Sequence, residues 1–458
     1  MRPSTSQDAA GPAPASPAGG HIFLPGDPGY DRARAAWNLA VDQHPAAVVL
    51  PTSAAEVVGA VRTAAAQGLR VVPQGTGHGA APLVGRVDDA LLLRLSRLTG
   101  VTIDPERRIA RVLGATPWHQ VVRAASAHGL ASLHGSGPDV GVVGYTLGGG
   151  LSWFARQHGL ACNAVTAIEV VRADGRLVRV HAGSSPELFW GLRGGGGNFG
   201  VVTAIEFGLL PFDDVFAGVM VWDAARAGQV CRAWAEWTHE VGKQVTTSLR
   251  LLGRTDLTGR HQLFPGRQVV VIDGAVLARD ERAAELIAPL RALRPEVDTF
   301  TRMPSRDLPG MHFDPQLPTS TVSEHLLMDD FDTRAADTLV EIAGLTSQTS
   351  LLSAEIRHLG GAAGRPDPYG GALDHVPGSY AGYFLAGAST PEVAARGRAD
   401  AAKAVDALNA WSNGRRFLNF TDKAVDPASA FSPQTLARLR QLRSQVDPDG
   451  LIVGNHEL

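Results

Sequence analysis

The spacing of apolar and polar positions over the first half of the chain predicts short helices alternating with short strands. Ser53 and Glu56 have the spacing of a capping box and open an alanine-rich helix that extends to about Gln67. Gly68 ends this helix, and the apolar run 69–73 has the length of a strand. Further elements are predicted as strands at 90–95, 101–103, 109–112 and 201–209, as helices at 118–128 and 186–192, and as a hairpin at 167–180. This is a mixed α+β pattern.

The pattern changes after Pro211, where longer helices and longer loops begin. The predicted helices lie at 224–239, 280–293, 333–345, 390–412 and 433–445, and the predicted strands lie at 269–275, 351–359 and 380–386. Two segments, 302–317 and 360–378, are rich in proline and glycine and are predicted to be long loops. Loops of this length are often binding loops. We therefore expect a second sheet after Pro211, with binding loops near it.

Composition excludes several classes of protein. The 458 residues include 44% hydrophobic and 19% charged ones, which is typical of a globular chain of two or three domains. The net charge of −3 gives no basic field for nucleic acid. Residues 1–20 have the composition of a disordered tail and no apolar core of a signal peptide, and no run is long enough to span a membrane. With only two cysteines, the expected compartment is the cytoplasm.

The most informative loop is 71–80, which places a histidine among three glycines directly after an apolar run. Glycine lets the backbone approach a ligand closely. Gly75, Gly77 and Ala80 nominally fit the dinucleotide fingerprint, but Pro82 follows where that motif needs a helix. A Rossmann site is therefore disfavoured, and a plain turn stays open for this loop alone.

Two further glycine clusters change this picture. They occupy 141–150 and 194–202. Glycine inside regular structure costs about 0.5–1 kcal/mol per residue, so three clusters in one domain indicate backbone wrapped around a large ligand. Backbone N–H groups in such loops can bind a diphosphate without a helix dipole.

Four more motifs accompany the glycine clusters: LFWGLR at 188–193, RHLGGA at 357–362, LNF at 418–420 and VDPDG at 446–450. The combination resembles the FAD-linked oxidases of the berberine bridge enzyme-like family, within the vanillyl alcohol oxidase superfamily. The resemblance implies an α+β fold with a PCMH-type FAD-binding domain of two subdomains at 21–212. A substrate domain with an antiparallel sheet covered by helices would occupy 213–413, and the segment 414–458 would return to the FAD domain.

The resemblance also implies a covalent flavin. In this family the histidine of the first loop is bonded to the flavin 8α-methyl, so His78 is the expected attachment residue. The alternative is a histidine that only lines a noncovalent site. Many members add a cysteinyl bond, but the matching position is Gly137, so no second link is expected and both cysteines are expected to pack in the core. Val140 matches the position that controls oxygen access, where a small residue resembles oxidases.

The residues expected to contact FAD share the three clusters and the nearby motifs. They are Gly75, Thr76, Gly77, His78, Gly79, Ala80, Val140, Gly141, Gly144, Tyr145, Gly148, Gly149, Asn163, Gly200, Val201 and Asn419. Tyr145 takes a position where many members have a histidine near the flavin. It is expected either to hydrogen-bond reduced flavin or simply to pack on glycines.

Oxidation of an alcohol by flavin needs a base for the O–H proton. The resemblance puts the family's base near Tyr383, while the C-terminal tyrosine of the family is replaced by phenylalanine at 417. Tyr383 is our first choice, with a buried strand aromatic as the alternative. Strand alternation places Glu355 and Arg357 on one face, where Glu355 is either a catalytic group or half of a structural ion pair with Arg357. His358 lies on the other face, where it either faces the flavin or caps the strand. No histidines have metal-ligand spacing, so no metal is expected.

The leading functional hypothesis is an oxidase that moves hydride from a small organic or secondary-metabolite substrate to flavin N5, with O2 as the acceptor and hydrogen peroxide as the product. One alternative is a flavoprotein cyclase or dehydrogenase of the same fold. Another is a catalytically silent flavin-binding protein. The expected partners are a small molecule and O2, without nucleic acid or membrane, for a monomer or homodimer.

Overall fold

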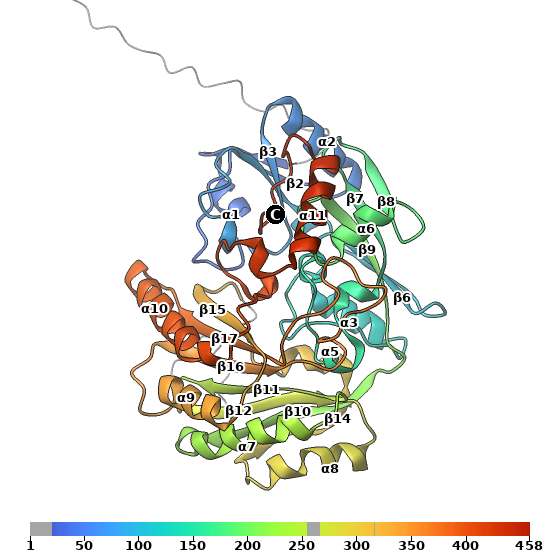
Figure 1. Cartoon of the computed structure of the whole chain (residues 1–458). Coiled ribbons are helices and arrows are strands. Elements are labelled where there is room, and N and C mark those ends of the chain that lie inside the picture. Colours follow the sequence, from blue (N-terminus) through green and yellow to red (C-terminus); the bar gives the residue numbers. More distant parts are fainter. Residues whose placement is uncertain (1–20, 254–265, 316) are drawn as a thin grey trace, which may run out of the picture.

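A computed structural model describes residues 21–253, 266–315 and 317–458 of the chain. The expected tail at 1–20 lies outside these residues. Three sheets carry the fold, two in the upper half of Figure 1 and one in the lower half.

The first sheet has the strand order β1 (His21–Phe23), β2 (Ala47–Leu50), β4 (Ala90–Arg94), β3 (Arg70–Gln74). Strands β2, β3 and β4 are parallel, and the helix α2 (Ala54–Ala66) makes the crossover from β2 to β3. The Ser53 side chain accepts a hydrogen bond from the Glu56 N–H, so the predicted cap is confirmed. Helix α1 (Tyr30–Arg34) lies on the other side of the sheet from α2.

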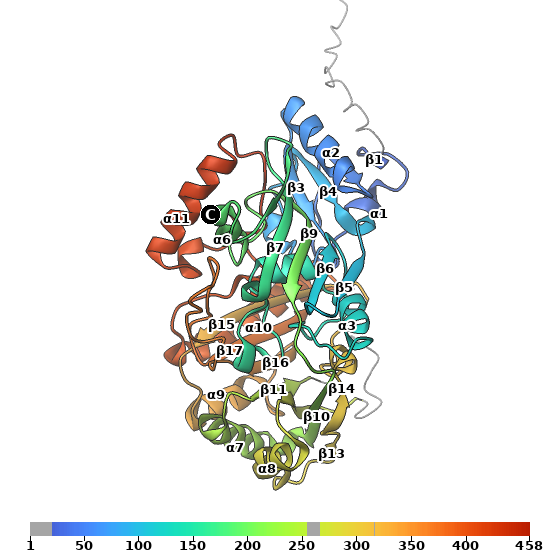
Figure 2. The same ribbon diagram turned by 90° about the vertical axis from the view of Figure 1, so that its right-hand side faces the viewer.

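The second sheet has the order β5 (Val101–Asp104), β6 (Ile109–Leu113), β9 (Val201–Gly208), β7 (Val165–Val171), β8 (Leu177–Val180), all antiparallel. Its core includes residues of α3 (Trp118–Ser126), α4 (Val142–Leu147) and α6 (Pro186–Leu192). Helix α11 (Pro433–Val446) packs beside α6, as Figure 2 shows. Helix α5 (Ala155–His158) contacts a strand of the third sheet, at Val245–Leu252.

The third sheet is antiparallel and runs β13, β10, β12, β11, β16, β17, β15, with β14 pairing on β10. The bounds are β10 (Asp214–Asp223), β11 (Val245–Leu252), β12 (Val269–Val276), β13 (Val297–Asp298), β14 (Thr301–Pro304), β15 (Thr321–Met328), β16 (Leu351–His358) and β17 (Tyr380–Gly387). Four helices cover one face: α7 (Ala227–Glu240), α8 (Asp280–Arg291), α9 (Thr333–Ala343) and α10 (Pro391–Ala407). An α+β fold with a helix-covered antiparallel sheet is therefore confirmed.

Several local expectations were incomplete. Strands β10, β11 and β15 were not anticipated, because β10 is buried on both faces and the other two carry polar side chains inward. The predicted loop 302–317 contains the end of β14 and a 3-10 helix at Ser305–Gly310. The helix predicted to 412 ends at Ala407. Within the middle glycine cluster the chain forms α4, which the three glycines at its end had obscured.

Candidate functional site

The first glycine loop leaves the carboxyl end of β3 with a row of unpaired backbone donors. Gln74 ends β3, and the N–H groups of 75–79 donate no hydrogen bond to any residue that the structure describes. Backbone N–H groups need partners, and consecutive free ones form a concave anion site. The edge formed by the carboxyl ends of parallel strands is also where ligands bind in α/β sheets. The loop therefore fits a diphosphate such as that of FAD.

Gly77 shapes this loop. Its φ is +90°, and an added Cβ would lie 2.5 Å from Gln74 Nε2 and 2.9 Å from the Cα of Ala36. Only glycine has both the conformational freedom and the size for this position. At Gly79 the space is more open, with only the Asn455 side chain at 3.1 Å from an added Cβ.

His78 lies between three side chains. Its Nδ1 is 2.8 Å from the Thr76 hydroxyl, and its Nε2 is 3.7 Å from Asp139 Oδ1. The ring stacks on Trp37 with 4.3 Å between centroids and 20° between planes. The side chain keeps 23% of its surface exposed. An expected attachment residue is thus accessible and held in one orientation.

The second cluster meets the first loop. An added Cβ at Gly141 would lie 3.5 Å from the Thr76 side chain, so the two segments are in contact. Gly144, on α4, is exposed and has no atom within 4 Å of an added Cβ. At Gly148 the Asn419 side chain occupies the space that a Cβ would need. The Asn419 Nδ2 donates a hydrogen bond to the Tyr145 carbonyl at 2.8 Å.

The remaining glycines of the predicted FAD site are explained by packing. Gly149 has a φ of +117° and lies against Leu373 and Phe417. Gly200 lies against the backbone of β7, with 2.6 Å from an added Cβ to the Val171 carbonyl oxygen, and the next residue, Val201, is fully buried. Gly149 and Gly200 therefore have close contacts within the protein that account for a glycine at each position, and the sequence could not separate these from contacts with a ligand.

Two further predicted residues also have partners within the protein. Asn163 donates to the Asp374 carbonyl at 2.9 Å and accepts from the Gly371 N–H at 3.2 Å. Tyr145 donates from its hydroxyl to the Leu133 carbonyl at 3.1 Å, and burial raises its pKa well above the usual value. Of the two expectations for Tyr145, packing on glycines agrees with its contacts with Gly135 and Gly150.

The segment before α4 is tightly packed. An added Cβ at Gly137 would lie 3.0 Å from Val140 Cγ2 and 3.9 Å from Asp314 Oδ2. Both cysteines are buried and unpaired, at Cys162 and Cys231. Any side chain at position 137 would thus press on Val140, and the segment also lies beside Asp314, in the loop before β15.

The uncovered face of the third sheet carries a row of polar side chains. Cross-strand pairs join His325 to Tyr383, Tyr383 to Glu355, and Glu355 to Arg250. Arg357, in the next row, lies over the rings of Trp153 and Phe420, at 5.5 and 5.4 Å from their centroids. This polar face therefore looks toward residues outside the sheet, on the side opposite the four helices.

A buried charge network occupies this face. Arg357 donates to Glu355 at 2.7 Å, which confirms that the two side chains share a face and form an ion pair. His312 Nδ1 is 2.8 Å from Asp273 Oδ2, and its Nε2 is 3.5 Å from Glu355 Oε2. Burial lowers the pKa of His312, but the carboxylates of Asp273 and Glu355 outweigh it and raise that pKa to about 9. His312 is therefore a cation at neutral pH.

Tyr383 adjoins a second polar group that includes an unexpected carboxyl. Ser323 donates a hydrogen bond to Asp422, and the Ser323 hydroxyl also lies close enough to the Tyr383 phenol to favour its ionised form. Burial raises the pKa of Asp422 to about 6, while the charge of His78 opposes that rise. Burial also raises the pKa of Tyr383, so its phenol is neutral. Asp422 thus adds a carboxyl group to the polar face near Tyr383.

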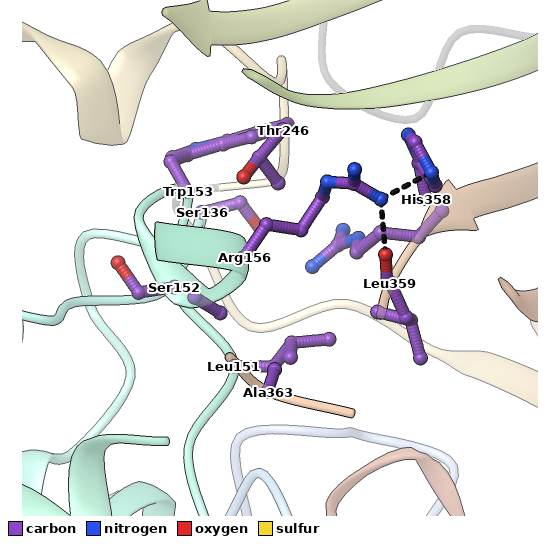
Figure 3. A pocket seen from close by; sticks show the side chains of 11 residues that line it. Ser136, Leu151, Ser152, Trp153, Arg156, Thr246, His358, Leu359 and Ala363 are labelled. Atoms are coloured by element: carbon purple, nitrogen blue, oxygen red, sulfur yellow. Dashed lines mark hydrogen bonds between the residues drawn. The ribbon is translucent and has the colours of Figure 1, made fainter. Parts of the chain in front are cut away.

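His358 lies on the helix-covered face, away from this group. Its Nε2 accepts a hydrogen bond from Arg156, and its ring stacks on Tyr380 at 5.3 Å. Burial holds its pKa well below the usual value. Figure 3 shows the pocket beside it, where Arg156 reaches the His358 ring and the Leu359 carbonyl. The pocket is too narrow for a water molecule. Strand alternation turns His358 to the face opposite Glu355 and Arg357, as expected, and its partners there are Arg156 and Tyr380.

Sequence reasoning missed three residues that the structure brings to this region: Trp37, Asp139 and Asp422. None lies in the glycine clusters or the four accompanying motifs, although Asp139 directly precedes Val140. Across the described ranges no group of histidine, cysteine and acidic side chains is arranged to hold a metal, and no helix there is both long and apolar enough to cross a membrane.

Comparisons with known proteins agree with this geometry. Residues 45–181 match the FAD binding domain family. The xylooligosaccharide oxidase of Thermothelomyces thermophilus is 34% identical over 230 residues, which cover 48% of this chain and 46% of that protein. The (R)-6-hydroxynicotine oxidase of Paenarthrobacter nicotinovorans is 31% identical over 204 residues, 44% of either protein. These matches span about half the length of the curated relatives.

Solved structures match over almost the whole chain. The 6-hydroxy-D-nicotine oxidase of Arthrobacter nicotinovorans has a TM-score of 0.82 at 22% identity, covering 94% of this chain and 96% of that one. BBE-like 1 of Physcomitrella patens has a TM-score of 0.82 at 20% identity, covering 96% of both chains. A variant of berberine bridge enzyme itself has a TM-score of 0.81 at 17% identity, covering 95% of this chain and 96% of that one. Residues 45–181 are thus similar to an FAD binding domain, and the chain has the fold of berberine bridge enzyme and of BBE-like 1.

Proposed function

We propose that the protein is an FAD-dependent oxidase that removes hydride from a small organic substrate and reduces O2 to hydrogen peroxide. The observation that carries this proposal is the position of the unpaired N–H groups of 75–79 beside His78, with the polar sheet face nearby. FAD, when bound, supplies the hydride acceptor at N5. The protein's own residues must bind the cofactor, hold the substrate and receive its proton.

In this proposal the first loop binds the FAD diphosphate and His78 attaches the flavin covalently. The loop's free N–H groups suit an anion. A neutral imidazole is a competent nucleophile, and His78 is exposed enough to meet the flavin edge. No cysteinyl link is proposed, since Gly137 occupies the matching position.

We assign the proton transfer to Tyr383, Ser323 and Asp422. A neutral phenol is a weak base on its own, because the pKa of Tyr383 is raised by burial. It can nevertheless accept the substrate proton if it gives its own proton onward at the same time. The Ser323 hydroxyl, hydrogen-bonded to Asp422, provides that path. Asp422 has a pKa of about 6, close to the operating range that a general base needs.

The paired charges of Glu355 and Arg357 suit binding and orientation more than proton transfer. The pKa of Glu355 is held well below its usual value, against the effect of burial, by the charges of Arg357 and His312. A carboxylate so strongly paired is a poor base. Its role in this proposal is to keep the Arg357 guanidinium between the rings of Trp153 and Phe420.

The deciding experiment is a substrate panel on the flavin-loaded protein, with substrate loss, O2 uptake and peroxide measured together. The curated relatives named as oxidases of xylooligosaccharides and of 6-hydroxynicotine suggest including oligosaccharides and hydroxylated nitrogen heterocycles. One peroxide per substrate consumed is expected. Turnover without O2 uptake would instead indicate the cyclase alternative, and a flavin that no substrate reduces would indicate a silent flavin-binding protein.

Covalent attachment has its own test. Acid-precipitated wild-type protein should stay yellow, whereas His78→Ala should release all its FAD into the supernatant. Yellow precipitate from the variant would contradict attachment through His78. We further propose a cytoplasmic monomer or homodimer, consistent with two buried, unpaired cysteines. Cell fractionation and light scattering on the eluted protein check these points.

A further inference from the structure

Asp139 forms one unit with Trp37 and His78. The Trp37 indole N–H donates to Asp139 Oδ2 at 2.5 Å, and the other carboxylate oxygen is 3.7 Å from His78 Nε2. Trp37 also stacks on the His78 ring. One side chain therefore holds both the ring plane of His78 and the carboxylate that faces its edge, although position 37 lies far from position 139 in the chain.

This arrangement favours one tautomer of the neutral His78 ring. An ionised carboxylate is a negative charge and accepts hydrogen bonds but cannot donate them, so it favours a proton on the ring nitrogen that faces it, 3.7 Å away. Burial raises the pKa of Asp139, but the contacts with His78 and Trp37 outweigh burial and lower it, so the carboxylate is ionised at neutral pH. Nε2 is then the protonated nitrogen, and Nδ1 keeps its lone pair, toward which the Thr76 hydroxyl donates at 2.8 Å.

We propose that Asp139 is the positioning residue for flavin attachment: it fixes the His78 proton on Nε2, which leaves Nδ1 to form the bond, and it receives that proton once the bond exists. The inference rests on the covalent link proposed above. Overall, one C–H bond of the flavin methyl and the imidazole N–H bond break, and one C–N bond forms. Two protons and two electrons pass to O2, which becomes hydrogen peroxide.

The test follows attachment itself, independently of turnover. Protein produced without FAD, in a riboflavin-starved host, is mixed with FAD in air. Covalent flavin is then measured over time by intact mass and by fluorescence of the denatured chain. Asp139→Asn should bind FAD but attach it about 100-fold more slowly, the usual scale of a lost proton acceptor. The control is Asp42→Asn, an exposed carboxylate paired with Arg34, which should attach FAD at the wild-type rate.

Two readouts separate proton transfer from mere packing. Added formate should restore attachment in Asp139→Ala, because a small carboxylate can enter the space that the side chain leaves. NMR of the flavin peptide should show the bond at Nδ1 of His78.

The outcomes distinguish this inference from the function on which it rests. Wild-type rates in Asp139→Asn, a bond at Nε2, or no rescue by formate would overturn the role of Asp139 alone. Wild-type protein that loses all its FAD on denaturation would overturn the covalent link, and this inference with it, while leaving the oxidase proposal to the substrate panel.

Discussion

Gly77→Ala should destabilise the protein more than Gly85→Ala, because only Gly77 lacks room for a methyl group. Both residues have left-handed backbone, with φ of +90° and +74°. Alanine in that region costs about 1–2 kcal/mol, and this cost applies to both variants. At Gly77 the new carbon would also lie 2.5 Å from Gln74 Nε2 and 2.9 Å from the Trp37 nitrogen, whereas at Gly85 no atom lies within 4 Å.

Overpacking of this kind costs about 1–3 kcal/mol, which sets the expected difference between the two variants. The gain from a stiffer unfolded chain is the same for both and cancels. Urea unfolding followed by circular dichroism, on protein without FAD, measures the difference directly. Equal free energies of unfolding for the two variants would refute the steric argument. FAD titration should then show weaker binding only for Gly77→Ala, since the strain displaces the backbone of the loop that carries the free N–H groups.

Two further variants test the polar face of the sheet. Tyr383→Phe should slow flavin reduction by a substrate from the panel about 10²–10⁴-fold in anaerobic stopped flow. The control is Tyr380→Phe, three residues earlier on the same strand, which should leave that rate unchanged. It should lower the free energy of unfolding by about 1 kcal/mol, because the Tyr380 hydroxyl is hydrogen-bonded to Thr238. Equal reduction rates in the two variants would exclude Tyr383 as the base. The pKa of Asp422 is raised from 3.8 to about 6, so ionisation of this carboxyl destabilises the folded protein. The destabilisation grows between pH 3.8 and about 6 and is constant above that pH. Asp422→Asn should therefore have a free energy of unfolding up to about 3 kcal/mol higher than wild type at pH 8. This difference should shrink toward zero as the pH falls to 4. A difference that does not change with pH would contradict the argument.

The sequence predicted well the elements whose signals are local. The helix after Ser53 follows from its cap, and the hairpin turn at Asp174 and Gly175 follows from turn chemistry. The alternation of Glu355 and Arg357 follows from strand geometry and led directly to their ion pair. These features depend on neighbours in the chain, which the sequence displays.

What the sequence could not show depends on distant contacts. A glycine needed for a ligand and one needed for packing look alike, so Gly200 was assigned to the FAD cradle although β7 explains it. Asp422 and Ser323 are 99 positions apart, and nothing in either segment indicates their hydrogen bond. Trp37 and Asp139 are likewise joined only by folding. Catalytic and positioning residues of this kind need the three-dimensional arrangement.

The edge of the first sheet imposes an order on the protein's maturation. Strand β3, which leads into the His78 loop, has its free edge closed by residues from the far end of the chain. The Val71 N–H donates to the Leu451 carbonyl at 2.7 Å, and the Val453 N–H donates back to Val71 at 2.8 Å. At synthesis rates of about 5–20 residues per second, the ribosome reaches Leu451 roughly 20–80 s after Val71. During that interval the loop at 75–79 is attached to an incomplete sheet, so FAD capture is expected only after residues 451–453 have been synthesised.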